Sequence, residues 1–411
     1  MKPNTIFIQI ASYRDPQLIP TIKSCLENAK YPDNLVFSIA WQHSPDDTWD
    51  NLDEFKCDAR FKIKDIYFKD SKGCCWARNL LQQQYDDEEY TLQLDSHHRF
   101  VENWDEKLLL MYKQLKDLGH EKPLITSYAS SFNPNNDPEE RVTSPYKMNF
   151  HKFIPEGAVF FLPATIDDHA TLTQPIPARF YSAHFAFTTG KFVKEVPHDP
   201  LLFFHGEEIS ITVRAYTWGY DLFHPHMIIV WHEYTRANRV KQWDDDAEWW
   251  KKNEDSHARN RTLFEMDGAI KNIDFGVYDF GPVRTLTDYE QYAGLSFKHR
   301  SATRHTLQHL DPPSPFEEHT HNIVFNHSIQ LKKHTLFPFH DYDFWAVIYE
   351  DVSGKSLFRR DLNKSEIQTY LMNDTIKIDV QFDCHALDIP HKWIVWPHSD
   401  QGWLKKIENT I

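Results

Sequence analysis

The chain has 411 residues, with 60 Asp or Glu against 45 Lys or Arg, so its formal net charge at pH 7 is −15. A chain of this length is too long to form a single hydrophobic core of ordinary size, so we predict a large domain together with a smaller one. The acidic balance argues against a nucleic-acid partner, which needs a basic surface to neutralise phosphates, and it does not indicate binding to an anionic membrane surface.

The first ten residues, MKPNTIFIQI, lack the basic region and the cleavage site of a signal peptide. No apolar run approaches the roughly 20 residues of a membrane span. The five cysteines are an odd number, and two of them, Cys74 and Cys75, are adjacent. Such a set fits a reducing compartment better than a disulfide framework. We therefore expect a cytoplasmic protein with no integral membrane segment, whereas the sequence does not indicate the oligomeric state.

The first third of the chain alternates strand and helix patterns. The predicted strands cover residues 5–11, 35–42 and 61–68, and the predicted helices cover 18–29 and 75–84. This order predicts an α/β fold with a mainly parallel sheet and helices on both faces. Ligands of such sheets bind beyond the carboxyl ends of the strands.

The most informative stretch is Tyr90 to Trp104, YTLQLDSHHRFVENW, in which an apolar strand runs into Asp95-Ser96-His97. Asp95 and His97 are two positions apart, so both project to one side of the strand tip. An oxygen and an imidazole on one side can share a divalent ion such as Mn²⁺, which accepts mixed ligands. The triplet alone is a weak signal, because a turn with a solvated His has the same sequence.

From residue 127 to about 180 the pattern loosens into strand pairs and loops rich in Pro and Asn. Such loops are often lids or acceptor-binding loops. Further on, FHGEEIS contains Glu207 and Glu208, IIVWHEY contains His232, and residues 243–264 have helical spacing with a charged face.

After about residue 305 the character changes to a Pro-rich segment, LDPPSPFEEH, followed by short alternating runs. We predict a large α/β domain over 1–305, a linker over 306–316 and a small β-rich, sandwich-like accessory domain over 317–411. The accessory domain could bind sugar or protein, or it could serve packing or oligomerisation.

Together these motifs resemble the nucleotide-sugar glycosyltransferases of the GT-A fold. LDSHHRFVENWDEKLL resembles the metal strand of the polypeptide N-acetylgalactosaminyltransferases, in which a DxH motif replaces the usual DxD. Residues 73–79 (GCCWARN) and 205–220 match segments on either side of it, and His232 falls where those enzymes place a third metal ligand. QIASYRD, LDSHHRF, FHGEEIS and the YE-x-x-x-G of residues 289–294 also resemble the related polypeptide α-N-acetylglucosaminyltransferases, glycosyltransferase family 60, of the Skp1 hydroxyproline type. The resemblance covers about residues 1–300.

The resemblance implies a retaining enzyme that moves N-acetylglucosamine, or a related hexose or N-acetylhexosamine, from a UDP-sugar to a hydroxyl group. The expected acceptor is a protein, at Ser, Thr or hydroxyproline. Mn²⁺ or Mg²⁺ is the implied cofactor, with Asp95, His97 and His232 as its ligands. Glu207 and Glu208 are the implied catalytic residues, with Glu207 near the sugar or the acceptor, although Glu208 could equally be a carboxylate favoured by a helix N-terminus.

The residues implied to bind the donor are Ser12, Tyr13, Arg14, Asp15, Arg78, Asp95, Ser96, His184, His257 and Arg259. For some of them a structural role stays open. Asp15-Pro16 could simply turn the chain into the next helix, Arg78 could cap a helix face, and His184 could be a core histidine bonded to backbone.

Three other functions stay open. The same chemistry could assemble a surface polysaccharide such as capsule or lipopolysaccharide, with a glycan acceptor. A metal-dependent hydrolase could use Asp95, His97 and His232, but the sequence has no HExxH motif to supply a base. A non-catalytic sugar-binding protein would fit the 13 Trp, 18 Tyr and 29 Phe, yet it would not need the metal and Glu motifs together. The epimer of the donor sugar and the identity of the acceptor have no general signature.

Overall fold

The computed structural model describes residues 2–49, 51–235, 239–317, 322–335, 341–385 and 388–411. The chain divides into two compact units, Met1–Glu317 and Glu318–Ile411. Residues 306–316, predicted as a linker, belong to the first unit. They are attached there because the backbone N–H of Ser314 donates to the carbonyl of Tyr292 (2.8 Å) and the hydroxyls of Thr303 and Ser314 bond to each other (2.9 Å).

A mainly parallel eight-stranded sheet forms the centre of the first unit. Its strands are β1 (Lys2–Tyr13), β2 (Leu35–His43), β3 (Phe61–Tyr67), β4 (Glu88–Asp95), β6 (Pro123–Thr126), β10 (Ile176–Pro177), β11 (Phe185–Thr189) and β12 (Asp221–His224). Their order is β10-β12-β6-β11-β4-β1-β2-β3. Strands β1 to β4 run parallel to one another, whereas β11 runs antiparallel between β4 and β6.

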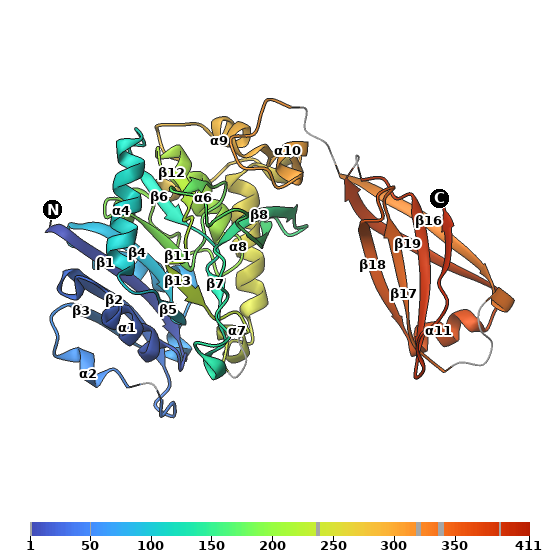
Figure 1. The fold of residues 1–411 in the computed structure, drawn as a ribbon, viewed down its shortest axis with the longest axis horizontal. Helices are drawn as coiled ribbons and strands as arrows, with labels where there is room; N and C mark the ends of the chain where they lie inside the picture. The colour runs from blue at the N-terminus through green and yellow to red at the C-terminus, as the bar shows by residue number, and fades with distance from the viewer. Residues whose placement is uncertain (1, 50, 236–238, 318–321, 336–340, 386–387) are drawn as a thin grey trace. The chain divides into compact units, whose positions relative to one another are not determined.

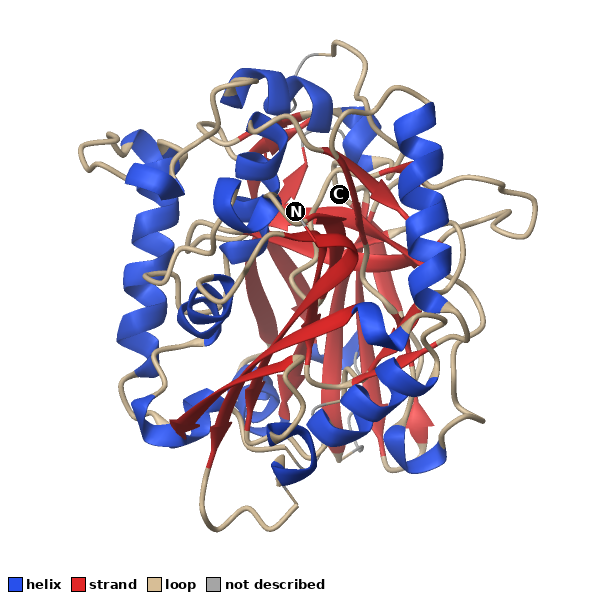
Figure 2. Cartoon of the chain, turned by 90° about the vertical axis from the view of Figure 1, so that its left-hand side faces the viewer, coloured by secondary structure: helices blue, strands red, loops and turns tan. Residues whose placement is uncertain are grey.

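Helices cover both faces of this sheet, as predicted for the α/β fold (Figures 1 and 2). On one face, α1 (Leu18–Glu27) and α4 (Trp104–Asp117) pack on Ile8 and Phe37. On the other, Leu81 of α3 (Cys74–Gln82) packs on Ala40, and α6 (Glu207–Thr217) packs on Leu222. Because β1 and β2 are buried on both faces, they need the nearly continuous apolar runs that the sequence shows.

Smaller elements surround the sheet and complete the first unit. The strands are β5 (His98–Phe100), β7 (Ser130–Ser131), β8 (Tyr146–Phe153), β9 (Val159–Thr165), β13 (Val230–His232), β14 (Leu295–Ser296) and β15 (Ser301–Ala302), and the helices are α2 (Asp53–Lys56), α5 (Phe192–Glu195), α7 (Gln242–Asp245), α8 (Trp249–Leu263), α9 (Leu286–Ala293) and α10 (Arg304–Leu307). Strands β5, β13 and β7 form a small sheet in the order β5-β13-β7, and β8 and β9 form a hairpin.

The helix predicted over residues 243–264 is two helices, α7 and α8. The break is at Asp246, whose backbone is extended (φ −118°, ψ 100°). Its carboxylate accepts a hydrogen bond from the backbone N–H of Glu248 (3.0 Å). Asp side chains compete in this way with helical hydrogen bonding, so the charged run starts a new helix instead of continuing the first.

The second unit is a two-layer β structure with a core of its own. Its elements are β16 (Asn322–Lys332), β17 (Tyr342–Glu350), β18 (Ser356–Asn363), α11 (Lys364–Leu371), β19 (Thr375–His385), β20 (Lys392–Ser399), β21 (Gly402–Trp403) and β22 (Ile407–Thr410). One layer is the antiparallel pair β16 and β19, and the other is built around β18, β17 and β20. Ile329 and Ile378 of the first layer share a core with Trp345 and Val395 of the second, as expected for sheets packed face to face.

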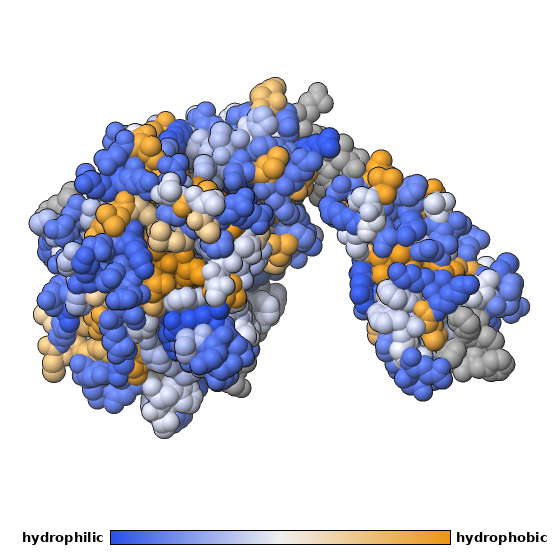
Figure 3. Space-filling view, viewed as in Figure 1, coloured by the Kyte–Doolittle hydropathy of each residue, from blue (hydrophilic) through white to orange (hydrophobic). Residues whose placement is uncertain are grey.

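The face that Figure 3 shows is largely hydrophilic, with apolar patches between polar areas. Among the described residues, none of the helices combines the length and the apolar composition that crossing a membrane requires.

Candidate metal and donor site

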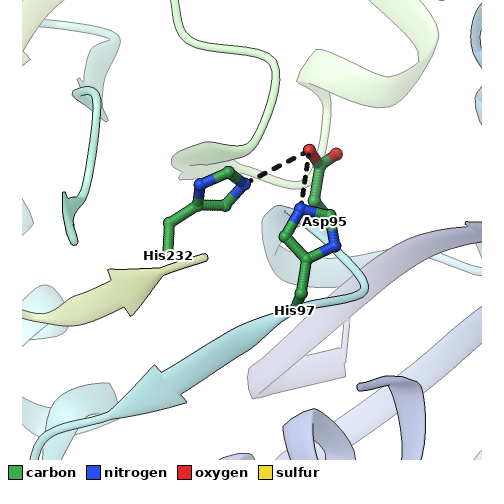
Figure 4. A group of neighbouring side chains, drawn as sticks. All are labelled: Asp95, His97 and His232. Carbon is green, nitrogen blue, oxygen red and sulfur yellow. Dashed lines mark ion pairs between the residues drawn. The ribbon is translucent and has the colours of Figure 1, made fainter. Parts of the chain in front are cut away.

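Three predicted metal ligands meet at the carboxyl end of β4. Asp95 is the last residue of β4, His97 lies in the turn before β5, and His232 ends β13. Strands β5 and β13 pair antiparallel, with His98 opposite His232, and this pairing brings His232 to Asp95. The Nε2 atoms of His232 and His97 lie 3.5 and 3.8 Å from Oδ2 of Asp95, and the three side chains point toward one another (Figure 4).

The protonation states of these side chains suit a divalent cation. Burial alone would raise the pKa of Asp95, but contacts with His232 and Arg78 hold that pKa well below its usual range. Burial lowers the pKa of His232 well below its ordinary value, so the ring is neutral. Both ring nitrogens of His232 are buried without a hydrogen-bond partner among the described residues. A carboxylate and a neutral imidazole with a free nitrogen belong to a donor set that fits Mn²⁺.

Asp15 orients His97. Burial would raise the pKa of Asp15, but His97 and Arg239 keep it lowered, so the group is ionised. Its Oδ2 accepts hydrogen bonds from Nδ1 of His97 (2.8 Å) and from the Ser96 hydroxyl (2.7 Å). A carboxylate that holds Nδ1–H leaves Nε2 free as the ligand atom. Asp15 and Ser96, which were interpreted as donor-binding residues, therefore support His97 and also line the cavity beside it, so their contact with the donor stays a prediction.

A cavity of about 160 Å³ opens beside the three ligands. Its walls come from the ends of β1 and β4, the start of α3, Phe203 and Phe204, and residues 239–243. It lies at the carboxyl edge of the parallel strands, which is the expected ligand position in an open α/β sheet.

Arg78 joins two carboxylates in the cavity wall. Its Nη2 donates to Oδ1 of Asp95 (3.0 Å), and its Nη1 lies 3.5 Å from Oε1 of Glu207. Burial raises the pKa of Glu207 to about 7, although Arg78 opposes the shift. Glu207 does not line the cavity itself and reaches it through Arg78.

Glu208 ties the first turn of α6 to two neighbouring segments. Its carboxyl group accepts hydrogen bonds from the hydroxyl of Tyr128 (3.0 Å) and from the backbone N–H of Ala183 (2.9 Å). Burial, together with the charge of Glu207, raises the pKa of Glu208 to about 8. At neutral pH the group is then protonated, unlike the carboxylate that a helix N-terminus would favour, and the role of Glu208 in catalysis stays a prediction.

His184 lies immediately before β11 and supports His232. Its Nε2 accepts a hydrogen bond from the backbone N–H of Ala129 (3.0 Å), and its ring stacks on the His232 ring at a centroid distance of 4.2 Å. It is therefore a buried histidine bonded to backbone, as the structural alternative expects, and it also packs on a metal ligand.

The residues predicted at the end of β1 take different positions. Tyr13 lines the cavity, and its hydroxyl donates to Asp245 (2.8 Å). Arg14 has a positive φ of 45° and forms ion pairs with Asp47 (2.8 Å) and Asp245 (3.0 Å). Ser12 is fully buried, and its carbonyl accepts a hydrogen bond from the side chain of Gln42 (3.0 Å). Of the four residues predicted here, Tyr13 and Asp15 line the donor cavity.

Two predicted donor residues on α8 lie outside the described cavity. Arg259 forms an ion pair with Asp199 (2.6 Å), and the ring of His257 meets the ring of His205 edge to face at 5.7 Å. Burial lowers the pKa of His257. Their assignment to the donor site stays a prediction.

The sequence reasoning missed Arg239 and Trp243, which both line the cavity. Arg239 donates to Asp15 (2.9 Å) and forms an ion pair with Glu233 (2.9 Å). The sequence offers one signal for Arg239, which comes seven residues after His232. A basic side chain that closely follows a metal ligand can reach the same phosphates.

The chain matches the family model described as Glycosyltransferase (GlcNAc) over residues 5–62 and 51–299. It belongs to this glycosyltransferase family. The match covers the sheet from the fourth residue of β1 onward and includes the three predicted metal ligands. Membership confirms the predicted class of enzyme, whereas the narrower likeness to the Skp1 hydroxyproline type stays a prediction.

The fold is also similar to solved structures at low identity. A structure of GalNAc-T7 with UDP, GalNAc and Mn²⁺ matches at a TM-score of 0.45 and 14% identity, over 59% of this chain and 44% of that chain, so the chain spans less than half of that protein's length. S. aureus TarS matches at a TM-score of 0.38 and 10% identity, over 99% of this chain and 77% of that chain. A search of curated proteins found no match.

Proposed function

We propose that this glycosyltransferase is a retaining, metal-dependent enzyme that transfers N-acetylglucosamine from UDP-N-acetylglucosamine to a hydroxyl group on a polypeptide, at Ser, Thr or hydroxyproline. The observation that carries the proposal is the convergence of Asp95, His97 and His232 on one point beside the cavity. The family match and the motif resemblance support the choice of a nucleotide sugar as the ligand.

Asp95, His97 and His232 would hold Mn²⁺ or Mg²⁺, with Asp15 fixing the ring of His97. When bound, such an ion acts as a Lewis acid that neutralises the charge developing on the diphosphate leaving group. Arg78 and Arg239 line the same cavity and would donate charge-assisted hydrogen bonds to phosphate oxygens. Tyr13 and Trp243 supply aromatic surface for the nucleoside.

The anomeric configuration is retained when the acceptor attacks the anomeric carbon from the same face that the diphosphate leaves. The bond between the anomeric carbon and the phosphate oxygen breaks, the acceptor oxygen bonds to the same face, and the acceptor proton passes to the leaving phosphate. No protein nucleophile is then required. We assign Glu207 to holding Arg78 against the donor and Glu208 to fixing α6, because these are the contacts that each carboxyl group makes.

Calorimetry of UDP binding with and without Mn²⁺ tests the proposal. UDP should bind tightly with Mn²⁺ and weakly in chelator. Asp95→Ala should lower turnover at least about 100-fold, or about 2.7 kcal/mol at the transition state. Asp33→Ala, at a fully exposed side chain, is the matched control. Equal UDP binding in chelator and in Mn²⁺ would contradict the metal site and favour a non-catalytic sugar-binding protein.

The donor and the stereochemistry need separate measurements. Hydrolysis of UDP-N-acetylglucosamine should be faster than hydrolysis of other UDP-sugars, and mass spectrometry of treated lysate should find the sugar on protein. Proton NMR of the product should show an α linkage, because the donor linkage is α. A β linkage would exclude the retaining mechanism, and modification of glycans alone would favour the polysaccharide-assembling alternative.

A further inference from the structure

A second cavity adjoins the donor cavity and is lined mostly by aromatic rings. Its volume is about 230 Å³, and its walls are Phe203, Phe204, His205, Trp243, Trp249 and Asn253. Phe203, Phe204 and Trp243 line both cavities. A molecule in the second cavity would therefore lie directly beside the donor, where an acceptor must lie.

The apolar surface extends from this cavity onto the hairpin of β8 and β9. Side chains alternate along β9, so that Phe161 is buried while Phe160 and Leu162 are 42% and 39% exposed. The ring of Phe160 lies 6.5 Å from the ring of His205, which lines the cavity. On the other side, Trp249 is 38% exposed. Large apolar side chains on both sides of a cavity are typical of a binding surface.

The composition of this surface favours a polypeptide over a glycan. A bound sugar needs a hydrogen-bond partner for most of its hydroxyls, because unpaired buried polar groups are costly. Besides the indole N–H groups of Trp243 and Trp249, the side chains of this cavity offer His205 and Asn253 for that purpose. Leu162 and the rings of Phe160 and Trp249 instead match the apolar side chains of a peptide.

The charge beside the cavity restricts the peptide further. Residues 244–255, which carry Trp249 and Asn253, contain six acidic residues and two lysines. Asp244, Glu248, Glu254 and Asp255 are exposed. Such an acidic rim attracts basic residues and repels anionic polymers.

We propose that Phe160, Leu162, Trp249 and the aromatic cavity bind the acceptor polypeptide, with an apolar side chain in the cavity and basic residues along the acidic rim. This inference rests on the proposed transferase function and names the surface that binds its acceptor and the composition of the peptide that this surface selects.

Synthetic nine-residue peptides with a central Thr, Ser or hydroxyproline test the inference, with Leu or Ser on the flanks and Lys or Glu further out. Wild-type enzyme should modify the Leu and Lys peptides most rapidly. Phe160→Ser and Trp249→Ser should raise KM for these peptides at least about ten-fold while donor hydrolysis stays within about two-fold. Leu110→Ser on α4, where Leu110 is 61% exposed, is the matched control and should change neither rate.

A panel of methyl glycosides and neutral oligosaccharides is measured in parallel. A preference for the Glu peptides, or a peptide KM unaffected by both variants, would overturn the inference while leaving the proposed function intact. Transfer to these glycans but to no peptide would overturn the inference and also the polypeptide acceptor of the proposed function. Wild-type enzyme that fails to bind UDP with Mn²⁺ would contradict the proposed function itself, so the two failures are distinguishable.

Discussion

At the scale of a single residue, the buried carboxylate of Asp15 fixes the ring of His97, a predicted metal ligand. It lines the donor cavity, where its contact with the donor stays a prediction, and it accepts hydrogen bonds from Ser96, His97 and Arg239. Asp15→Asn keeps the volume and removes the charge, so the His97 ring loses its fixed tautomer. We expect the affinity for Mn²⁺ to fall about 10- to 100-fold, measured by electron paramagnetic resonance of free Mn²⁺. Asp33→Asn is the exposed control, and unchanged Mn²⁺ affinity in Asp15→Asn would show that His97 does not need this support.

Glu208 should make stability depend on pH. Its carboxyl group ionises near pH 4.5 in the unfolded chain and near pH 8 in the folded protein. Between these values the folded state binds the extra proton, so this group makes stability fall as pH rises, by about 1 kcal/mol for each pH unit. Glu208→Gln removes the contribution.

Urea unfolding in chelator at pH 5.5, 6.5 and 7.5 gives the free energy of unfolding of both proteins. The effect of Glu208 is the value for Glu208→Gln minus the value for wild type at each pH. We expect this difference to increase with pH. The buried histidines contribute equally to both proteins and cancel. Glu121→Gln, at an exposed side chain, should give a constant difference. Parallel pH profiles for Glu208→Gln and wild type would show that Glu208 is ionised throughout.

At the scale of elements, α6 begins where only a glycine fits. Gly206 precedes the helix with φ at +105°, and a Cβ there would come within 2.4 Å of Nδ2 of Asn260 on α8. That amide also donates to the carbonyl of Gly206 (3.0 Å). Gly206→Ala should therefore strain the backbone and push α8 away from the start of α6, where Glu207 meets Arg78.

We expect Gly206→Ala to lower the free energy of unfolding by about 1–3 kcal/mol more than Gly119→Ala. Gly119 has a similar φ of +96°, but a Cβ there would meet no atom within 4 Å. Comparison of the two variants therefore separates the effect of the contact with Asn260 from the effect of the backbone strain, which occurs at both glycines. Equal losses in the free energy of unfolding of the two variants, measured by urea unfolding, would mean that α8 moves aside at no cost in stability.

The elements that the sequence could predict are those whose signal is local. The apolar runs of β1 and β2 and the spacing of Asp95 and His97 are each complete within a few residues. His232 was reached by motif resemblance, because its position beside Asp95 depends on the pairing of β5 with β13. No local pattern indicates that Arg259 faces Asp199 or that Arg239 faces Asp15, since both contacts join segments far apart in the chain.

At the scale of the whole molecule, the two units have separate cores. The core that contains Trp345 and Val395 includes only residues of the second unit, and the cores around the sheet include only residues of the first. Independent cores predict independent folding. We expect the heat-capacity curve of the full chain to show two transitions, one of them reproduced by residues 318–411 alone.

A chain that ends at Glu317 should therefore keep Mn²⁺-dependent UDP-sugar hydrolysis. A chain that ends at Thr306 should melt at a lower temperature, because it loses the hydrogen bonds of Ser314 to Tyr292 and Thr303. Transfer to the protein acceptor should fall in the chain that ends at Glu317 if the second unit presents that acceptor, and only stability should fall if the unit serves packing. Comparison of hydrolysis, transfer and thermal melting separates these outcomes. Every residue that lines the donor cavity lies before Glu317. Loss of UDP binding in a folded chain of residues 1–317 would therefore contradict this position of the donor site.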